Sequence, residues 1–204
     1  MIEDITYKLS INNYVPFETP KKQIVIGHTF NHGMKHVIGW KHRFNGEYKK
    51  TAAFTIDQEG VIYKHFEPKY HSNILGSKEI DKKSVVILLE NDGWLLKDTE
   101  KNLFISWVGD IYKGPDKVVE KRWREYTYWA PYTEKQKQSA LTLIKELCAE
   151  FSIPMVSISH NTKVDNLDKY EGILYRSNLD KYYTDLSPAW NFEEFKNKIE
   201  LKID

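Results

Sequence analysis

Three side chains that could bind a metal ion lie next to the apolar segments of this sequence. His28 ends the run QIVIGH, whose β-branched residues favour a buried strand. His160 follows a second short apolar run, residues 155–159, and Asp185 lies in a polar segment before the last helix-like stretch. Two imidazoles, one carboxylate and a water would complete the four-coordinate arrangement typical of hydrolytic zinc sites. Zinc-assisted hydrolysis is therefore the first hypothesis.

Spacing alone does not single out these three residues. The chain contains seven histidines and 29 acidic residues, so many such triples exist, and a histidine at a strand end is often a hydrogen-bonded structural residue. His28, His32 and His36 also recur at intervals of four, but Gly33 interrupts the helical face that a metal site would need. His65 could equally be an ordinary surface or cleft residue.

Composition excludes several classes of function. The 204 residues include 30 basic and 29 acidic side chains, so no overall field attracts nucleic acid. No apolar segment approaches the roughly 18 residues of a membrane span, and the N-terminal residues lack the apolar core of a secretory signal. We therefore expect synthesis in the cytoplasm without a signal peptide. The single cysteine, Cys148, excludes an internal disulfide, and its apolar surroundings favour a buried thiol over a nucleophile.

The elements that must position these residues are short strands and amphipathic helices within one domain. Residues 84–89 are continuously apolar, which is typical of a central strand covered on both faces. Residues 51–56 and 61–66 flank the turn-rich sequence DQEG and predict a hairpin. The clearest helix covers residues 133–151, with Thr133 and Gln136 as its capping box. Further predicted elements are a strand over residues 23–28, a helix over 34–44, a strand over 155–159 and a last helix capped by Asn191.

Residues 94–132 show no regular pattern and contain four of the six tryptophans. A connection of this length is too long for a simple turn, which indicates a functional insertion rich in aromatic residues. Residues 1–22 are expected to form an N-terminal extension packed on a domain that spans residues 23–204.

Seven blocks of the sequence follow one another in the order found in a known enzyme family. They are IVIGHTF, TAAFTIDQEGVIY, KYHSN, ENDGWL, PYTEKQKQSALTLIKEL, IPMVSISH and DLSPAWNFEEF, within about residues 20–200. Their order and spacing resemble the zinc-dependent N-acetylmuramoyl-L-alanine amidases, which include amidase-type phage lysozymes and peptidoglycan recognition proteins. The resemblance implies a single α/β domain with a central mixed β-sheet flanked by α-helices. It also implies a zinc ion held by His28, His160 and Asp185.

The sequence departs from this family around the implied metal. The carboxylate of the family's central strand aligns with Leu88, and Glu90 lies two residues further on. A tyrosine and a lysine common among the relatives align with Ala52 and Tyr183. Since release of an amine needs a proton donor, the resemblance implies Glu90, Tyr183 and His71, in this order, as candidates for acid–base catalysis.

The resemblance implies hydrolysis of the amide between N-acetylmuramic acid and the L-alanine of the stem peptide. Trp94, Trp107 or Trp129 would stack on the glycan, although core packing would explain each of them equally well, and Asn91 would lie near the substrate. The implied partner is peptidoglycan or its muropeptides. The protein would act on it at the cell wall as a phage endolysin, or on muropeptides in the cytoplasm. The alternatives are a peptidoglycan-binding module of the same fold without turnover and a structural component of a phage particle. The oligomeric state is left open.

Overall fold

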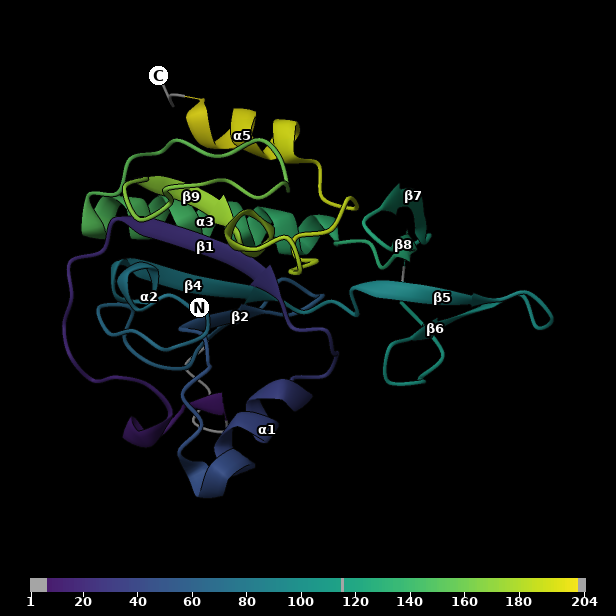
Figure 1. Ribbon diagram of the computed structural model, residues 1–204, viewed down its shortest axis with the longest axis horizontal. Coiled ribbons are helices and arrows are strands. Elements are labelled where there is room, and N and C mark those ends of the chain that lie inside the picture. The colour runs from purple at the N-terminus through teal and green to yellow at the C-terminus, as the bar shows by residue number, and fades with distance from the viewer. Residues whose placement is uncertain (1–6, 115, 202–204) are drawn as a thin grey trace.

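A computed structural model describes residues 7–114 and 116–201 of the chain, arranged around two β-sheets (Figure 1). The larger sheet has five strands in the order β3-β2-β4-β1-β9, and the smaller has four in the order β6-β5-β8-β7. The larger sheet consists of β1 (Gln23–His28), β2 (Phe54–Ile56), β3 (Ile62–Lys64), β4 (Ser84–Leu89) and β9 (Gly172–Tyr175). The smaller sheet consists of β5 (Trp94–Asp98), β6 (Leu103–Ser106), β7 (Val119–Trp123) and β8 (Tyr126–Trp129).

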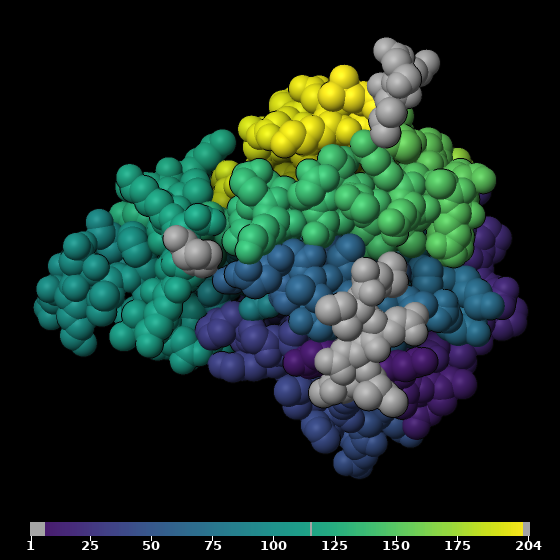
Figure 2. All heavy atoms as spheres, turned by 180° about the vertical axis from the view of Figure 1, so that it is seen from behind, coloured from purple at the N-terminus to yellow at the C-terminus, as the bar shows by residue number. Residues whose placement is uncertain are grey.

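The helices surround the larger sheet, and the smaller sheet projects to one side of the molecule (Figures 1 and 2). The α-helices are α1 (Lys35–His42), α2 (Lys78–Lys83), α3 (Glu134–Phe151), α4 (Arg176–Leu179) and α5 (Phe192–Glu200), with 3₁₀ turns η2 (Ile11–Asn13) and η3 (Arg43–Gly46). None of these helices is both long enough and apolar enough to cross a membrane. The single cysteine, Cys148, is buried in α3.

Strands β1 and β4 form the centre of the larger sheet, and every residue of both is buried. They pair in parallel from Gln23 with Ser84 onward, and β1 also pairs in parallel with β9, where Ile26 lies opposite Tyr175. The hairpin of β2 and β3 is antiparallel, so the sheet is mixed. The predicted α/β class with a central mixed sheet and flanking helices is confirmed. Ligands of such sheets usually bind beyond the carboxyl ends of the parallel strands.

Most of the strongly patterned elements form as predicted. The strands over residues 23–28 and 84–89 coincide with β1 and β4, and the predicted hairpin forms from shorter strands. Helix α3 begins after Thr133, whose hydroxyl accepts a hydrogen bond from the Gln136 amide in a complete capping box. Helix α5 begins after Asn191, which caps it as expected.

Two predictions about local structure are wrong. Residues 94–132 are not irregular, because they contain the four short antiparallel strands of the smaller sheet, in which Trp94 stacks on Tyr126 and Trp129 is fully buried. Residues 155–159 do not form a strand. Only Ser157 makes a bridge, to Ile173 of β9, through bonds of the Val156 carbonyl and the Ile158 amide with Ile173.

The described part of the N-terminal extension packs on the rest of the chain. The amide of Leu9 donates to the His65 carbonyl, and Val15 bridges to His71. The buried Lys21 donates hydrogen bonds to the carbonyls of Lys82 and Ser84. Residues 1–6 of the predicted extension lie outside the described residues, and its boundary at residue 22 stays a prediction.

Candidate functional site

A cleft of about 660 Å³ lies beside the carboxyl end of β1. Its lining includes His28 from β1, Arg176 from the start of α4 and Tyr183 from the loop that follows. Trp94 of β5 and Trp107 after β6 line the same cleft, so the smaller sheet contributes part of its wall. The cleft therefore joins the two sheets at the edge where the parallel strands end.

His28 is buried and neutral in this site. Its Nδ1 atom lies 2.7 Å from the Tyr132 hydroxyl oxygen, and its ring packs edge-on against Phe30. Its Nε2 atom is buried and has no hydrogen-bond partner among the described residues. Burial lowers the pKa of His28 to about 4, although the Asp185 carboxylate opposes this and the Arg176 guanidinium adds to it. The imidazole is therefore uncharged at neutral pH.

Asp185 lies beside the backbone of His28. Its side chain is fully buried, and its Oδ2 atom accepts a hydrogen bond of 3.1 Å from the His28 amide. The same oxygen lies 3.3 Å from Nη1 of Arg176, whose guanidinium also covers the ring of Tyr183 at 4.5 Å. The Oδ1 atom is buried and has no partner within the described part of the chain.

His160 does not join the other two implied ligands. It is exposed, and its Nδ1 atom lies 2.8 Å from the Thr162 hydroxyl. Across residues 7–114 and 116–201, no three histidine, cysteine, aspartate or glutamate side chains are grouped so that they could hold a metal ion. The structure thus brings together His28 and Asp185 but leaves His160 apart.

The reason is that β9, and not residues 155–159, is the strand beside β1. Because Ile26 lies opposite Tyr175, the next residue, Arg176, lies beside the end of β1. A Cβ atom on Gly27 would lie 2.6 Å from Cδ of Arg176 and 2.5 Å from Oδ2 of Asp185. Sequence reasoning missed Arg176, and the only signal for it is the four-residue apolar run GILY that precedes it.

The residues present do not fit a zinc site with three protein ligands. His28 Nε2 and Asp185 Oδ1 are possible ligand atoms that are buried and have no hydrogen-bond partner among the described residues. At the neighbouring strand end, however, there is a guanidinium, which carries a fixed positive charge and no lone pair for a metal. That guanidinium already contacts the Asp185 carboxylate.

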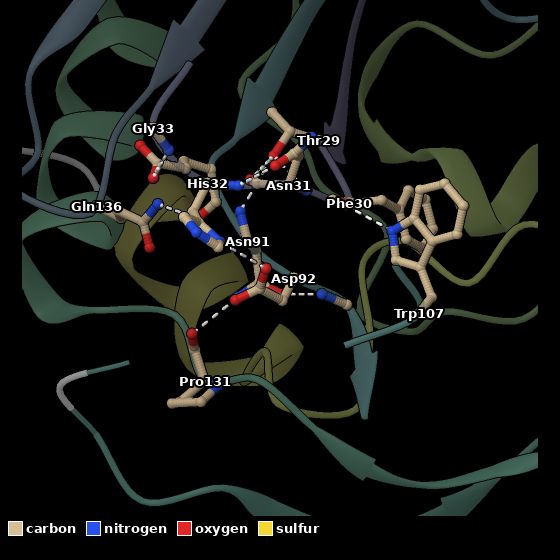
Figure 3. A network of polar contacts seen from close by, with 12 residues as sticks. Thr29, Phe30, Asn31, His32, Gly33, Asn91, Asp92, Trp107, Pro131 and Gln136 are labelled. Atoms are coloured by element: carbon tan, nitrogen blue, oxygen red, sulfur yellow. Dashed lines mark hydrogen bonds and ion pairs between the residues drawn. The ribbon is translucent and has the colours of Figure 1, made fainter. Parts of the chain in front are cut away.

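Glu90 is not in the His28 cleft. Its Oε1 atom accepts a hydrogen bond of 2.7 Å from the Gly33 amide, and its backbone carbonyl accepts one from Gln136 (Figure 3). It lines a neighbouring cleft together with His32, while Leu88 is the β4 residue that lines the His28 cleft. Burial raises the pKa of Glu90, and the Gly33 amide opposes this. Strand β4 therefore presents an apolar side chain to His28.

Asn91 has a structural role. Its Nδ2 atom donates to the carbonyls of Ala130 and Pro131, at 3.2 and 2.8 Å, and its Oδ1 atom accepts from the Gly93 amide (Figure 3). The side chain is buried. These bonds join the turn after β4 to the end of β8 and leave no group of Asn91 directed to a ligand.

The other two candidates for acid–base catalysis occupy different places. Tyr183 lines the His28 cleft, where its ring lies against Arg176. His71 is buried in a separate groove beside Asp81 and Lys82. Burial lowers the pKa of His71, and the charges of Lys21 and Lys82 lower it further. The structure thus brings only Tyr183 close to His28.

Two of the predicted aromatic contacts line the cleft. Trp107 is 51% exposed, and its Nε1 atom donates a hydrogen bond of 2.7 Å to the Phe30 carbonyl (Figure 3). Trp94 is half-buried and stacks on Tyr126. Trp129, in contrast, is fully buried and packs in the core of the smaller sheet.

The charged side chains that line the cleft are cationic. No aspartate or glutamate is found among the described residues that line it. The fully charged cations are Lys35, Arg43, Lys50 and Arg176. Such a lining produces a positive potential that attracts anionic groups.

Comparison with known proteins gives the family. The family described as N-acetylmuramoyl-L-alanine amidase matches residues 17–170, which include His28 and His160 but end before Arg176 and Asp185. No curated protein matches the sequence. Three solved structures share the fold. They are the amidase LysC from Clostridium intestinale URNW, PlyL, and AmiD from E. coli in complex with the substrate anhydro-N-acetylmuramic acid-L-Ala-D-gamma-Glu-L-Lys.

Sequence identity to all three structures is low. LysC is 14% identical with a TM-score of 0.52, over 96% of this chain and 91% of that chain. PlyL is 11% identical with a TM-score of 0.55, over 98% of this chain and 95% of that chain. AmiD is 13% identical with a TM-score of 0.57, over 90% of this chain and 59% of that chain. These structures show the fold, and the match over most of the sequence shows that the chain belongs to the N-acetylmuramoyl-L-alanine amidase family.

Proposed function

We propose that this chain binds peptidoglycan through the cleft beside His28, at the junction between N-acetylmuramic acid and the stem peptide. Membership of the amidase family supports peptidoglycan as the ligand. The observation that carries the proposal is the composition of the cleft, which combines an exposed, fixed tryptophan with several cations and, among the described lining residues, no carboxylate. This combination suits a ligand that is part sugar and part acidic peptide.

Trp107 supports contact with the sugar. Half of its surface is exposed in the cleft, and the hydrogen bond from Nε1 to Phe30 fixes the ring without covering its face. A large aromatic surface with its polar group already bonded can pack on the apolar face of a sugar ring at little cost in conformational entropy.

The cations support contact with the stem peptide. A glutamate linked through its γ-carboxyl, as in the ligand bound to AmiD, retains a free α-carboxylate. Lys35 and Lys50 are exposed at the cleft, and Arg43 lies over the ring of Tyr48 at 5.3 Å. Such side chains attract a carboxylate and speed its association, with modest energies at each exposed position.

Hydrolysis of the amide between N-acetylmuramic acid and L-alanine is the second candidate function. One observation favours it, namely that His28 Nε2 and Asp185 Oδ1 are both buried and unpartnered among the described residues. Zinc dependence, as predicted from the sequence, would require a third ligand that the described residues do not place beside them. Three further points stay predictions: a role in cell-wall lysis, an origin in a phage, and synthesis in the cytoplasm without a signal peptide.

Co-sedimentation with purified sacculi tests the proposal. The chain should sediment with sacculi equally well in a chelator and in zinc, and Trp107→Ala should reduce the bound fraction severalfold. Tyr182→Ala is the matched control, because Tyr182 is 78% exposed but does not line the cleft. Absence of co-sedimentation would refute the proposal. Mass spectrometry of the supernatant distinguishes binding from hydrolysis, because hydrolysis would release new stem peptides that begin with L-alanine.

A further inference from the structure

We propose that Arg176 takes the place of a metal ion in this site, so that its guanidinium, and not zinc, supplies the positive charge at the end of β1. The inference concerns the cleft of the proposed function. It does not depend on peptidoglycan binding, since metal content and unfolding can be measured without any ligand.

The first step in the argument is the position of Arg176. Parallel pairing of β1 with β9 puts Arg176 at the end of β9, next to the strand that ends at His28. Gly27 leaves room for it, because a Cβ atom there would lie 2.6 Å from Cδ of Arg176. The side chain of Arg176 thus reaches Asp185 at the Gly27 backbone, where the Asp185 carboxylate also accepts from the His28 amide.

The second step concerns charge. The Asp185 side chain is fully buried, and a buried carboxylate is stable only with a nearby positive charge and hydrogen bonds. Arg176 provides the charge at 3.3 Å, and its own side chain is only 13% exposed. Arg124 lies nearby and donates to the backbone carbonyls of Ser177 and Asp180, which fixes helix α4 and with it Arg176. The guanidinium of Arg176 therefore balances the charge of the Asp185 carboxylate without a metal ion.

The third step concerns competition with a metal ion. A zinc ion bound to His28 Nε2 and Asp185 Oδ1 would have two protein ligands and a guanidinium beside it, so repulsion would weaken its binding. The guanidinium has five N–H donors, of which the contact with Asp185 through Nη1 uses only part. Arg176 also lines the cleft. It can therefore donate to a carbonyl or carboxylate oxygen of a bound ligand while it remains paired with Asp185.

Measurement of zinc content by mass spectrometry, with calorimetric titration, tests this inference. The wild-type chain, dialysed against zinc and then against buffer, should retain far less than one equivalent. Arg176→His should gain one equivalent, because it adds an imidazole at the end of β9 beside His28 and Asp185. The gain should disappear in Arg176→His with His28→Ala and persist in Arg176→His with His160→Ala. One tightly bound equivalent in the wild type, lost on His28→Ala, would overturn the inference, as would a folded Arg176→His variant without zinc.

Thermal unfolding provides the readout if Arg176→His does not fold. The midpoint of the wild-type chain should be the same in zinc and in chelator, and a clear rise in zinc would overturn the inference. The two proposals can fail separately. Absence of sacculus binding would refute the proposed function and leave the role of Arg176 intact. Zinc bound by the wild type would refute the role of Arg176 and leave peptidoglycan binding intact.

Discussion

Asp185 and Arg176 form a buried ion pair at the site that the sequence assigned to a metal. Pairs of this kind add little stability relative to apolar residues, but removal of one partner leaves an uncompensated charge in the interior. The backbone amide of His28 also bonds to Asp185, so the carboxylate holds the end of β1 in place. The pair is therefore expected to matter for both the fold and the cleft.

Arg176→Met should lower the free energy of unfolding by about 3–5 kcal/mol, because it removes the cation that contacts the buried Asp185 and leaves only Arg124 nearby. The double variant Arg176→Met with Asp185→Asn should recover most of this loss, since the charge is then removed as well. Urea unfolding at neutral pH measures both values. A double variant no more stable than Arg176→Met alone would contradict the assigned pairing.

Gly27 is a position where even a methyl group should be costly. An added Cβ atom would lie 2.5 Å from Asp185 Oδ2 and 2.6 Å from Arg176 Cδ. Gly27→Ala should therefore destabilise the chain by about 1–3 kcal/mol, the usual cost of overpacking. Gly39→Ala in α1 is the control, because nothing lies within 4 Å of its Cβ position and alanine favours a helix. Equal unfolding midpoints for the two variants would argue against this geometry.

Residue types pointed to His28, and the family resemblance pointed to Asp185. His28 was identified because it ends an apolar run, and the carboxylate of Asp185 accepts a hydrogen bond from its backbone amide. His160 was chosen because residues 155–159 look like a strand, whereas Arg176 follows a run of only four residues. Which of two short runs pairs with β1 depends on partners distant in the chain, and a single sequence does not contain this information.

At the scale of elements, the half-buried His36 and the buried His65 connect α1, β2 and the end of β3. His36 Nε2 and His65 Nε2 lie 3.1 and 2.9 Å from the Thr55 hydroxyl, and His65 Nδ1 donates to the Tyr7 carbonyl. His65 Nε2 therefore accepts from Thr55, and His36 Nε2 donates to it. This arrangement requires the His65 ring to be neutral, because a protonated ring has no acceptor nitrogen.

The pH dependence of stability should reflect these rings. Burial lowers the pKa of His36 to about 3, with His65 adding to the effect, and lowers that of His65 to about 4. The unfolded chain then binds more protons below its own histidine pKa, so stability is present near neutrality and is lost as pH falls from about 6.5 towards 4. Each ring should contribute on the order of 3 kcal/mol.

Urea unfolding at pH 7 and pH 5 checks this dependence. His65→Gln keeps a neutral donor and acceptor but cannot titrate in this range, so its loss of stability between the two pH values should be smaller than that of the wild type. His42→Gln is the control, because His42 is exposed at the end of α1. Identical pH dependence in the wild type and His65→Gln would show that this histidine is not held neutral.

Elements with strong patterns were predictable, and elements defined by their partners were not. Strands β1 and β4 are continuous apolar runs, and α3 has both a capping box and an apolar face. The strands of the smaller sheet have four or five residues, and β5 and β7 each combine one tryptophan with charged side chains. Their pairing comes from contacts such as Trp94 with Tyr126, which no local period reveals.

At the scale of the whole molecule, the cleft exists because two sheets meet. The larger sheet provides His28, and the smaller sheet adds Trp94 and Trp107, the latter bonded to Phe30 just after β1. The sequence indicated an aromatic insertion over residues 94–132 but did not predict the strands within it. The position of these tryptophans beside His28 depends on how the sheets dock, which explains why Trp129, of the same type, lies instead in the core.

Binding of acidic muramyl peptides should weaken as salt increases, because the cations of the cleft are exposed. Lys35→Gln and Lys50→Gln should each raise the dissociation constant about two- to fivefold at low salt, with a smaller effect at high salt. Lys196→Gln, on α5 and away from the cleft, should leave it unchanged. Fluorescence titration measures these constants, and an affinity independent of salt would contradict a role for the cations.

Calorimetric titration of the chain with a soluble muramyl peptide, in chelator and in zinc, tests the central claim most directly. If the site recognises peptidoglycan with Arg176 in place of a metal, both titrations should give the same dissociation constant, and the peptide should be recovered intact. Binding that requires zinc, or release of the peptide from N-acetylmuramic acid in zinc alone, would contradict the account.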